Sequence, residues 1–485
     1  MINYLKLLFF RSKFLFKYIR KEKSASVVQR NLVDCENEYS KIPSDEMISF
    51  PATWVTELYT PSLARELVKK IKKLGWGDSG FSDQSASDWI NSLRRGTFSG
   101  RKYFEPIVSD RTGKLLSTDC REKAVLPSGV VSIKPTLCSI SPSITALNIL
   151  FIFDKKVSGS LQDILTSEYT AVVTRGKRYS FIDYVRFVFL GKDLNHFDNI
   201  EMPTNIRERM SSDIFRLRKD VCAQWVKSNI PGVFSNIDGS CIPNTNFIVS
   251  ESNVISPDLC REKPSFRSIC DSGDSFWTSR DWIGSTFRIP VINSECELYL
   301  YSRRKDAFGV NSMSSMDSID TSDFELIRRA ECDVLTIMNE FSVGFLLTSY
   351  SYILSEMRDN ISRGDNKRIV RNLKDYRKLS MEWIYDIKAV VLDIYDKNGV
   401  EARSTYGLPR LNRVGSVDER SEHDLKTILR EASYKDAQRL EKEVRYLESV
   451  FDTINSTSQA ISSIRLQRWA IFFAVVTFIA TVIGI

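Results

Sequence analysis

The acidic residues that best suggest chemistry lie in a stretch rich in Ser and Asp. Asp271 and Asp274 enclose a Ser-Gly pair, and Asp281 stands between Trp277 and Trp282. Acids and aromatic rings gathered in a loop are typical of a site for a metal ion or a polar ligand. In a hydrolase or transferase these three aspartates would be the catalytic candidates. The same pattern also fits a solvated turn capped by aspartate, and the sequence leaves both interpretations open.

The common catalytic and cofactor motifs are absent from the sequence. It contains no G-x-x-x-x-G-K-[ST], H-E-x-x-H or G-x-S-x-G pattern. Gly75, Gly77 and Gly80 have the Gly-x-Gly-x-x-Gly spacing of a dinucleotide-binding loop. They follow a predicted helix and not a strand, so the strand-turn-helix that binds a pyrophosphate is missing. The 2 histidines and 9 cysteines show no metal-ligand spacing, and the cysteines are predicted to be ordinary thiols of a reducing compartment. We expect no metal and no cofactor, and the sequence favours a protein without enzymatic activity while leaving an enzyme open.

The composition predicts a folded protein with a nearly neutral body. The 485 residues are 42% hydrophobic, which is too apolar for a disordered chain. The formal net charge is +7, and residues 1–23 account for most of it, because they hold seven Lys and Arg and one Glu. A body with so little net charge argues against nucleic acid as the main partner.

The first 23 residues predict a basic amphipathic helix that lies on a membrane surface. At about 100° per residue the cationic side chains fall on one stripe, and apolar side chains fill most of the remaining surface. Two alternatives stay open: an organellar presequence and a helix packed on the protein's own core. The stripe consists of Lys6, Lys13, Lys17 and Arg20.

The last 17 residues, 469–485, read WAIFFAVVTFIATVIGI and predict one transmembrane helix. At about 1.5 Å per residue this segment is about 25 Å long, which is the short end of what spans a bilayer. Arg465 and Arg468 precede it, which predicts that the body lies in the cytoplasm and that the protein is tail-anchored. Small residues follow one face of this helix and predict packing between anchors: Ala470, Ala474, Thr477, Thr481 and Gly484.

The chain between the two ends predicts a mixed α/β domain followed by helices. Residues 61–74, 88–95 and 213–226 fit helices, and residues 130–133, 147–153, 171–174, 247–249 and 297–301 fit strands. The expected fold class is an α+β (mixed α/β) soluble domain, then an antiparallel helical pair, a long coiled-coil-like stalk helix and one C-terminal transmembrane helix. The predicted units after 1–23 are a linker (24–48), the α/β domain (49–308), a linker (309–323), a helical hairpin (324–397), a loop (398–418), the stalk (419–468) and the anchor (469–485).

The predicted stalk carries a heptad of apolar residues, which indicates a coiled coil and hence a homo-oligomer. The alternative is an amphipathic helix that packs on the preceding hairpin of the same chain. The heptad positions are Leu440, Val444, Leu447, Phe451, Ile454 and Ile461.

The helical pair, the long stalk and the apolar span ending in Gly484 together resemble the stalk and first span of CorA-type magnesium channels. The resemblance covers about the last third of the chain and implies a component of a divalent-ion channel. The sequence has neither the Gly-Met-Asn signature of that family nor a second span. The selectivity filter therefore corresponds to no residue of this chain.

These observations predict an oligomeric, tail-anchored membrane protein whose cytoplasmic α/β domain acts as a sensor, scaffold or membrane effector. Two alternatives are a CorA-like divalent-ion channel component and a membrane-tethered hydrolase or transferase. The expected partners are a lipid membrane and further copies of the chain. The sequence identifies no small-molecule or protein ligand of the α/β domain.

Overall fold

The computed structural model describes residues 33–483 with twelve internal gaps. The gaps are 77–84, 96–99, 110–122, 175–198, 238–240, 271–274, 279–284, 290–295, 308–320, 363–382, 396–410 and 415–423. In the last helix the side chains of 454–455, 457–458, 461–462 and 479–483 also lie outside the description.

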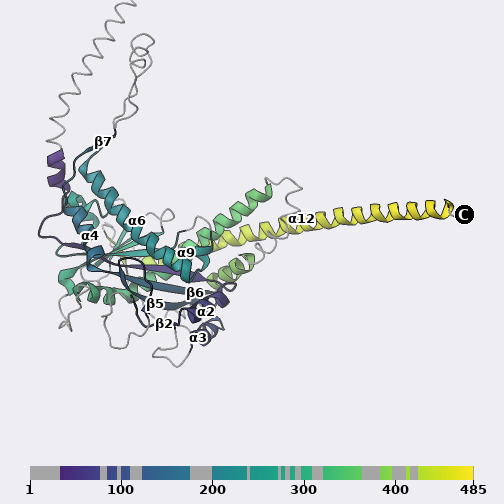
Figure 1. Cartoon of the computed structure of the whole chain (residues 1–485), viewed down its shortest axis with the longest axis horizontal. Helices are drawn as coiled ribbons and strands as arrows, with labels where there is room; N and C mark the ends of the chain where they lie inside the picture. Colours follow the sequence, from purple (N-terminus) through teal and green to yellow (C-terminus); the bar gives the residue numbers. More distant parts are fainter. Residues whose placement is uncertain are drawn as a thin grey trace, which may run out of the picture.

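A mixed β-sheet forms the centre of the described chain (Figure 1). Its strands follow the order β13-β10-β11-β12-β9-β1-β6-β5-β3-β4, and β2 pairs with β5. Strands β9 and β12 are parallel, as are β3 and β4, and the other pairs are antiparallel. The strands are β1 (Ile48–Tyr59), β2 (Arg101–Tyr103), β3 (Ile107–Ser109), β4 (Lys123–Ala124), β5 (Val130–Ser141), β6 (Ile144–Phe153), β9 (Asn244–Ser250), β10 (Ser275–Thr278), β11 (Ser285–Ile289), β12 (Glu297–Arg303) and β13 (Asn412–Arg413). A separate pair joins β7 (Val172–Thr174) to β8 (Asn199–Glu201).

Helices cover both faces of this sheet. The helices are α2 (Ala64–Lys73), α3 (Ala86–Arg94), α4 (Lys155–Thr166), α6 (Pro203–Asn229), α7 (Val233–Asn236), α8 (Pro257–Glu262), α9 (Thr321–Ser362) and α12 (Leu425–Ile483), with helical segments at 33–40 and 383–395 and two short 3-10 helices, η1 (Pro264–Phe266) and η2 (Arg304–Ala307). Local signals set their ends: the Asp154 side chain accepts a hydrogen bond from the Val157 N–H at 2.7 Å and so caps α4. Pro203 opens α6 at the position where proline costs no hydrogen bond.

The central strand β1 is buried on both faces and divides two hydrophobic cores. Phe50 and Val55 belong to the larger core, which also takes in α2, α3, α4, α6 and α7. Ala52 and Trp54 belong to the smaller core, which the first half of α9 and the start of α12 cover. Burial on both faces explains the nearly continuous apolar run of β6.

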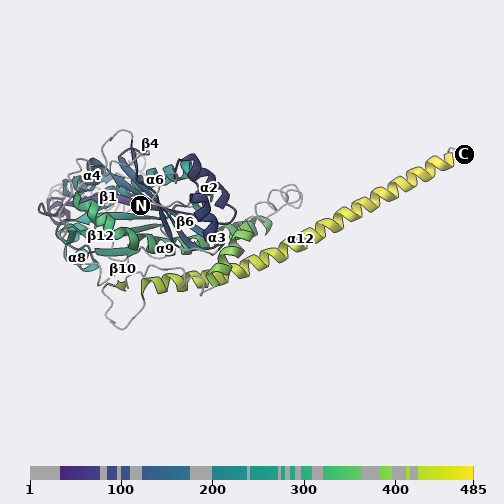
Figure 2. The same ribbon diagram turned by 90° about the horizontal axis from the view of Figure 1, so that it is seen from below.

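Three helical segments form an arm that continues from the sheet. Arg430 of α12 pairs with Glu340 of α9 at 2.9 Å, and Ser351 of α9 donates to Glu443 of α12 at 3.2 Å, so both helices run in the same direction. The segment 383–395 runs in the opposite direction, because Tyr395 donates to Glu441 while Lys388, earlier in the chain, pairs with the later Glu448. Beyond residue 451 α12 leaves the body as a single rod (Figures 1 and 2).

The predicted membrane anchor is wrong for the part of the chain that the structure describes. No helix among these residues is long and apolar enough to cross a membrane. Most of the predicted span lies within α12, which continues to Ile483.

This finding corrects four predictions that rested on the span. They are the fold class with its transmembrane helix, the tail-anchored membrane protein as function, the membrane keywords, and the single-pass location with a cytoplasmic body. The CorA-like channel and the membrane-tethered enzyme required the same span and fall with it. The structure instead has a mixed α/β fold in which α9 packs directly on the sheet.

The cysteines also depart from the prediction of free thiols. Cys241 is bonded to Cys296, and Cys260 is bonded to Cys270. The first pair meets because β9 and β12 are parallel with Asn244 opposite Glu297, so the residues that precede the two strands are neighbours. The free cysteines of the described chain are Cys35, Cys138, Cys222 and Cys332.

Candidate functional site

Most of the predicted site residues lie outside the described residues. Asp271 and Asp274 come just before β10, and Asp281 falls between β10 and β11, in segments that the structure does not describe. The predicted membrane-surface residues Lys6, Lys13, Lys17 and Arg20 also lie outside the description. The roles of all seven residues stay predictions.

The residues predicted for packing between anchors lie near the end of α12. Ala470, Ala474 and Thr477 are exposed on this helix, and no segment of the described chain covers them. The Thr477 hydroxyl donates to the Phe473 carbonyl at 2.8 Å, so its hydrogen bond stays within its own helix. The side chain of Thr481 and the whole of Gly484 lie outside the description.

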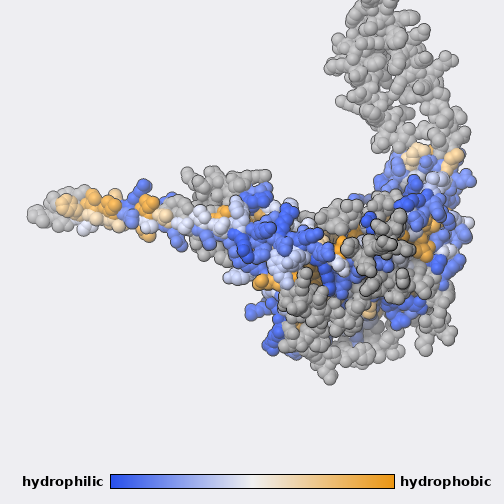
Figure 3. All heavy atoms as spheres, turned by 180° about the vertical axis from the view of Figure 1, so that it is seen from behind, coloured by the Kyte–Doolittle hydropathy of each residue, from blue (hydrophilic) through white to orange (hydrophobic). Residues whose placement is uncertain are grey.

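Residues 469–478 of α12, called here the rod tip, expose apolar side chains in all directions. Trp469 packs its ring against Phe472 and Phe473 at centroid distances of 5.8 and 5.9 Å, yet each of these rings is at least 55% exposed. Figure 3 shows the apolar colour along this free end, well away from the body. The large exposed apolar residues of the rod tip are Trp469, Ile471, Phe472, Phe473, Val475, Val476 and Phe478.

The first part of the predicted heptad is buried within the chain itself. Leu440, Val444 and Leu447 join the larger core with Leu346 and Leu354 of α9. The amphipathic helix packed on its own hairpin is therefore the interpretation that holds for these positions. The side chains of the later heptad residues Ile454 and Ile461 lie outside the description.

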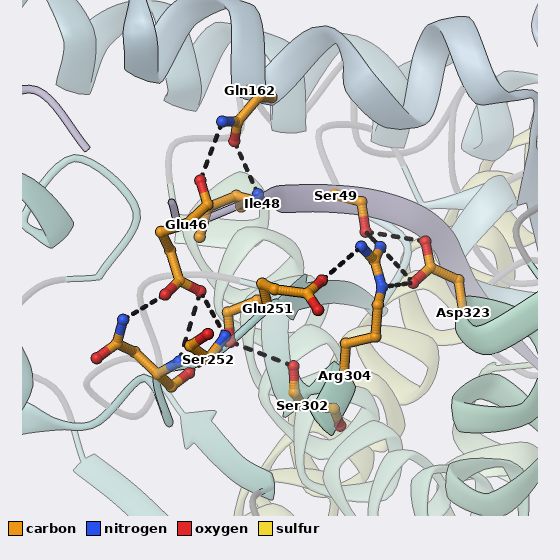
Figure 4. A network of polar contacts seen from close by, with 11 residues as sticks. Glu46, Ile48, Ser49, Gln162, Glu251, Ser252, Ser302, Arg304 and Asp323 are labelled. Atoms are coloured by element: carbon orange, nitrogen blue, oxygen red, sulfur yellow. Dashed lines mark hydrogen bonds and ion pairs between the residues drawn. The ribbon is translucent and has the colours of Figure 1, made fainter. Parts of the chain in front are cut away.

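A buried ion pair joins the start of α9 to the end of β12 (Figure 4). Arg304, whose side chain is 8% exposed, donates to Asp323 Oδ1 from Nη2 at 2.8 Å and from Nε at 3.2 Å. A second carboxylate, Glu251 at the end of β9, accepts from Arg304 Nη1 at 3.0 Å. Ser49 of β1 donates to Asp323 Oδ2 at 2.9 Å. The guanidinium thus holds β1, β9, β12 and α9 together.

A second group of hydrogen bonds beside this ion pair joins β1 to α4. Glu46 accepts from the Ser252 N–H at 2.9 Å and also from the Asn253 side chain. Gln162 of α4 donates to the Glu46 carbonyl at 3.1 Å and accepts from the Ile48 N–H at 2.7 Å (Figure 4). The carboxylates around Arg304 and the carboxylate of Glu46 all accept hydrogen bonds from protein donors. This is typical of residues that stabilise the fold and not of an open ligand site.

Glu57 is a buried acid of β1 that faces the start of α7. Its carboxylate accepts from the Phe234 N–H at 2.7 Å, and from the Ser235 N–H and hydroxyl at 3.0 and 2.6 Å. Burial raises the pKa of Glu57 to about 7, although these hydrogen bonds act in the opposite direction. Its oxygens are fully engaged and the residue is 1% exposed, so it stabilises the fold and meets no substrate.

The described residues contain no cluster of metal-ligating side chains, and the comparisons found no similar protein. No group of three or more His, Cys, Asp or Glu among them is placed to hold a metal. Comparisons with protein-family models, curated proteins and solved structures found no match for this chain.

The sequence does not predict the hydrogen bonds around Arg304, because their partners lie far apart along the chain. Arg304 and Asp323 are 19 residues apart, and Glu251 is 53 residues from Arg304. No periodicity connects them: the parallel pairing of β9 and β12 places Glu251 beside Arg304, and the start of α9 brings Asp323 to the same point. Of these two features, the sequence indicated only the apolar run of the rod tip.

Proposed function

We propose that the chain is a self-associating protein in which the rod tip forms the contact between copies and the α/β body is carried on the resulting bundle. The observation that supports this most directly is the exposure of seven large apolar side chains over residues 469–478, each between 45 and 68% exposed. A helix that is apolar on every side is normally covered, because so large an exposed patch is unfavourable in water.

A second copy of the chain is the occupant that best fits this surface. Every copy brings the same helix, and the rod projects clear of the body, so the tips of several copies can meet without any movement of the bodies (Figures 1 and 2). A symmetric contact of this kind closes and gives a discrete oligomer. Burial of one Phe side chain contributes about 1.5–3 kcal/mol. A contact that repeats this burial in every copy is strong enough to persist at micromolar concentration.

Sedimentation velocity of the full chain tests the proposal. We expect a discrete multiple of 55.7 kDa for the unmodified protein, and weakening of the association by about a hundredfold or more when Phe473→Asp and Phe478→Asp are combined. The matched control is Tyr385→Asp on the segment 383–395, because Tyr385 is 70% exposed but lies on the arm. A monomer in the unmodified protein, or equal association of the double variant and the control, would contradict the proposal.

A further inference from the structure

The arm contains a groove between α9 and α12 that nothing described above uses. Where Gly344 faces Ser433, a Cβ on the glycine would lie 3.5 Å from the serine hydroxyl, and Ala437 is fully buried nearby. These small residues bring the two helices close together. Further along both helices, large side chains line a gap. The gap has a volume of about 420 Å³, which is within the range of small-molecule sites.

The floor of the groove is apolar and its rim is aromatic and cationic. Leu354 and Leu447, at 1 and 2% exposure, form the floor, and Tyr446, at 58%, offers its ring as a wall. Arg358 comes from α9 and Lys442 from α12, so the two cations stand on opposite helices of the same groove.

The acid that lines the groove is already occupied. Glu443 accepts from Ser351 at 3.2 Å and pairs with Arg439 at 3.1 Å. Among the described residues Arg358 pairs with its neighbour Asp359, at 3.7 Å between Nε and Oδ1, which is a long contact. The two cations, which stand on opposite helices, outnumber the one acid of the lining, so an anionic group complements the groove.

We infer that this groove binds a small organic anion that carries an aromatic or aliphatic group. The anion contacts Arg358 and Lys442 from the two sides, and the apolar part rests on Leu354 and Leu447 beside the Tyr446 ring. The inference is independent of the proposed self-association, because the groove lies on the arm, at least twenty residues before the rod tip on α12.

Two fluorescent dyes with the same rings separate the charge from the apolar contact. The anionic dye is 8-anilino-1-naphthalenesulfonate, and N-phenyl-1-naphthylamine is its uncharged counterpart. Each is titrated into the full chain and into the variants Arg358→Glu, Lys442→Glu and Lys435→Glu. Lys435 is the control, because it is exposed on α12 but does not line the groove.

We expect the dissociation constant of the anionic dye to rise about tenfold or more in Arg358→Glu and Lys442→Glu, and to stay near the unmodified value in Lys435→Glu. The uncharged dye should bind all four proteins about equally, because it makes no ionic contact. Raising the salt from about 0.05 to about 0.5 M should weaken only the anionic dye. This measurement uses the unmodified protein and does not depend on any variant folding.

Three outcomes would overturn the inference. The first is no saturable binding of the anionic dye to the unmodified protein. The second is equal binding by Lys442→Glu and Lys435→Glu, which would place the dye elsewhere, for example beside Arg468 at the rod tip. The third is an equal loss of both dyes in the groove variants, which would show an apolar contact without recognition of the charge.

Discussion

Arg304 and Asp323 form a buried ion pair, 2.8 Å between Nη2 and Oδ1, that ties the first turn of α9 to the end of β12. The pair connects the sheet to the helix that leads into the arm. Both side chains are buried, so water screens this contact little.

Removal of one partner of this pair should destabilise the protein strongly. Asp323→Ala leaves Arg304 buried with Glu251 as its remaining carboxylate. We expect a loss of about 2–4 kcal/mol in the free energy of unfolding, measured by urea denaturation. The control Arg329→Ala removes an exposed pair with Glu325 and should cost less than about 1 kcal/mol. Equal losses in the two variants would show that the buried pair has no special role.

Two glycines provide a matched test of packing. A Cβ on Gly232 would lie 2.3 Å from Glu57 Cγ and 2.6 Å from the Leu58 carbonyl oxygen, so Gly232→Ala must displace β1 or α7. We expect a loss of about 1–3 kcal/mol in thermal or urea unfolding. Gly159, within α4, has no atom within 4 Å of such a Cβ. Gly159→Ala should instead stabilise the protein by up to about 1 kcal/mol. An unchanged or increased stability of Gly232→Ala would contradict this packing around Gly232.

Glu57 should make stability fall as the pH rises through neutrality. Its pKa is raised from 4.5 to about 7 in the folded chain, so between these values the folded state binds more protons than the unfolded state. The stabilisation is complete below about pH 4.5 and is lost as the pH rises through about 7. Urea unfolding across pH 4.5–8 should show this slope, and Glu57→Gln should remove the part that belongs to this residue. An identical slope in the two proteins would assign the pH dependence to other groups.

The local elements of the fold were largely predictable from the sequence. The strands expected at 147–153 and 297–301 are found as β6 and β12, and the helix expected at 61–74 is found as α2. The strand β1 was not predicted, and Pro51 within it is untypical of a central strand. Pro51 lies where the pairing of β1 with β9 shifts register, between Ser49 and Ala52, so its missing N–H removes no regular hydrogen bond.

Local pattern determined which segments of this protein form strands and helices, because periodicity and capping act over a few neighbouring residues. It also marked the apolar composition of the rod tip. Only the tertiary structure decided what those segments touch. The parallel pairing of β9 and β12 joined Cys241 to Cys296 and gathered the partners of Arg304. The side-by-side course of α9 and α12 buried Leu440 and Leu447 within the chain and opened the groove. Such contacts join residues that are far apart in the sequence, so no local spacing of residues predicts them.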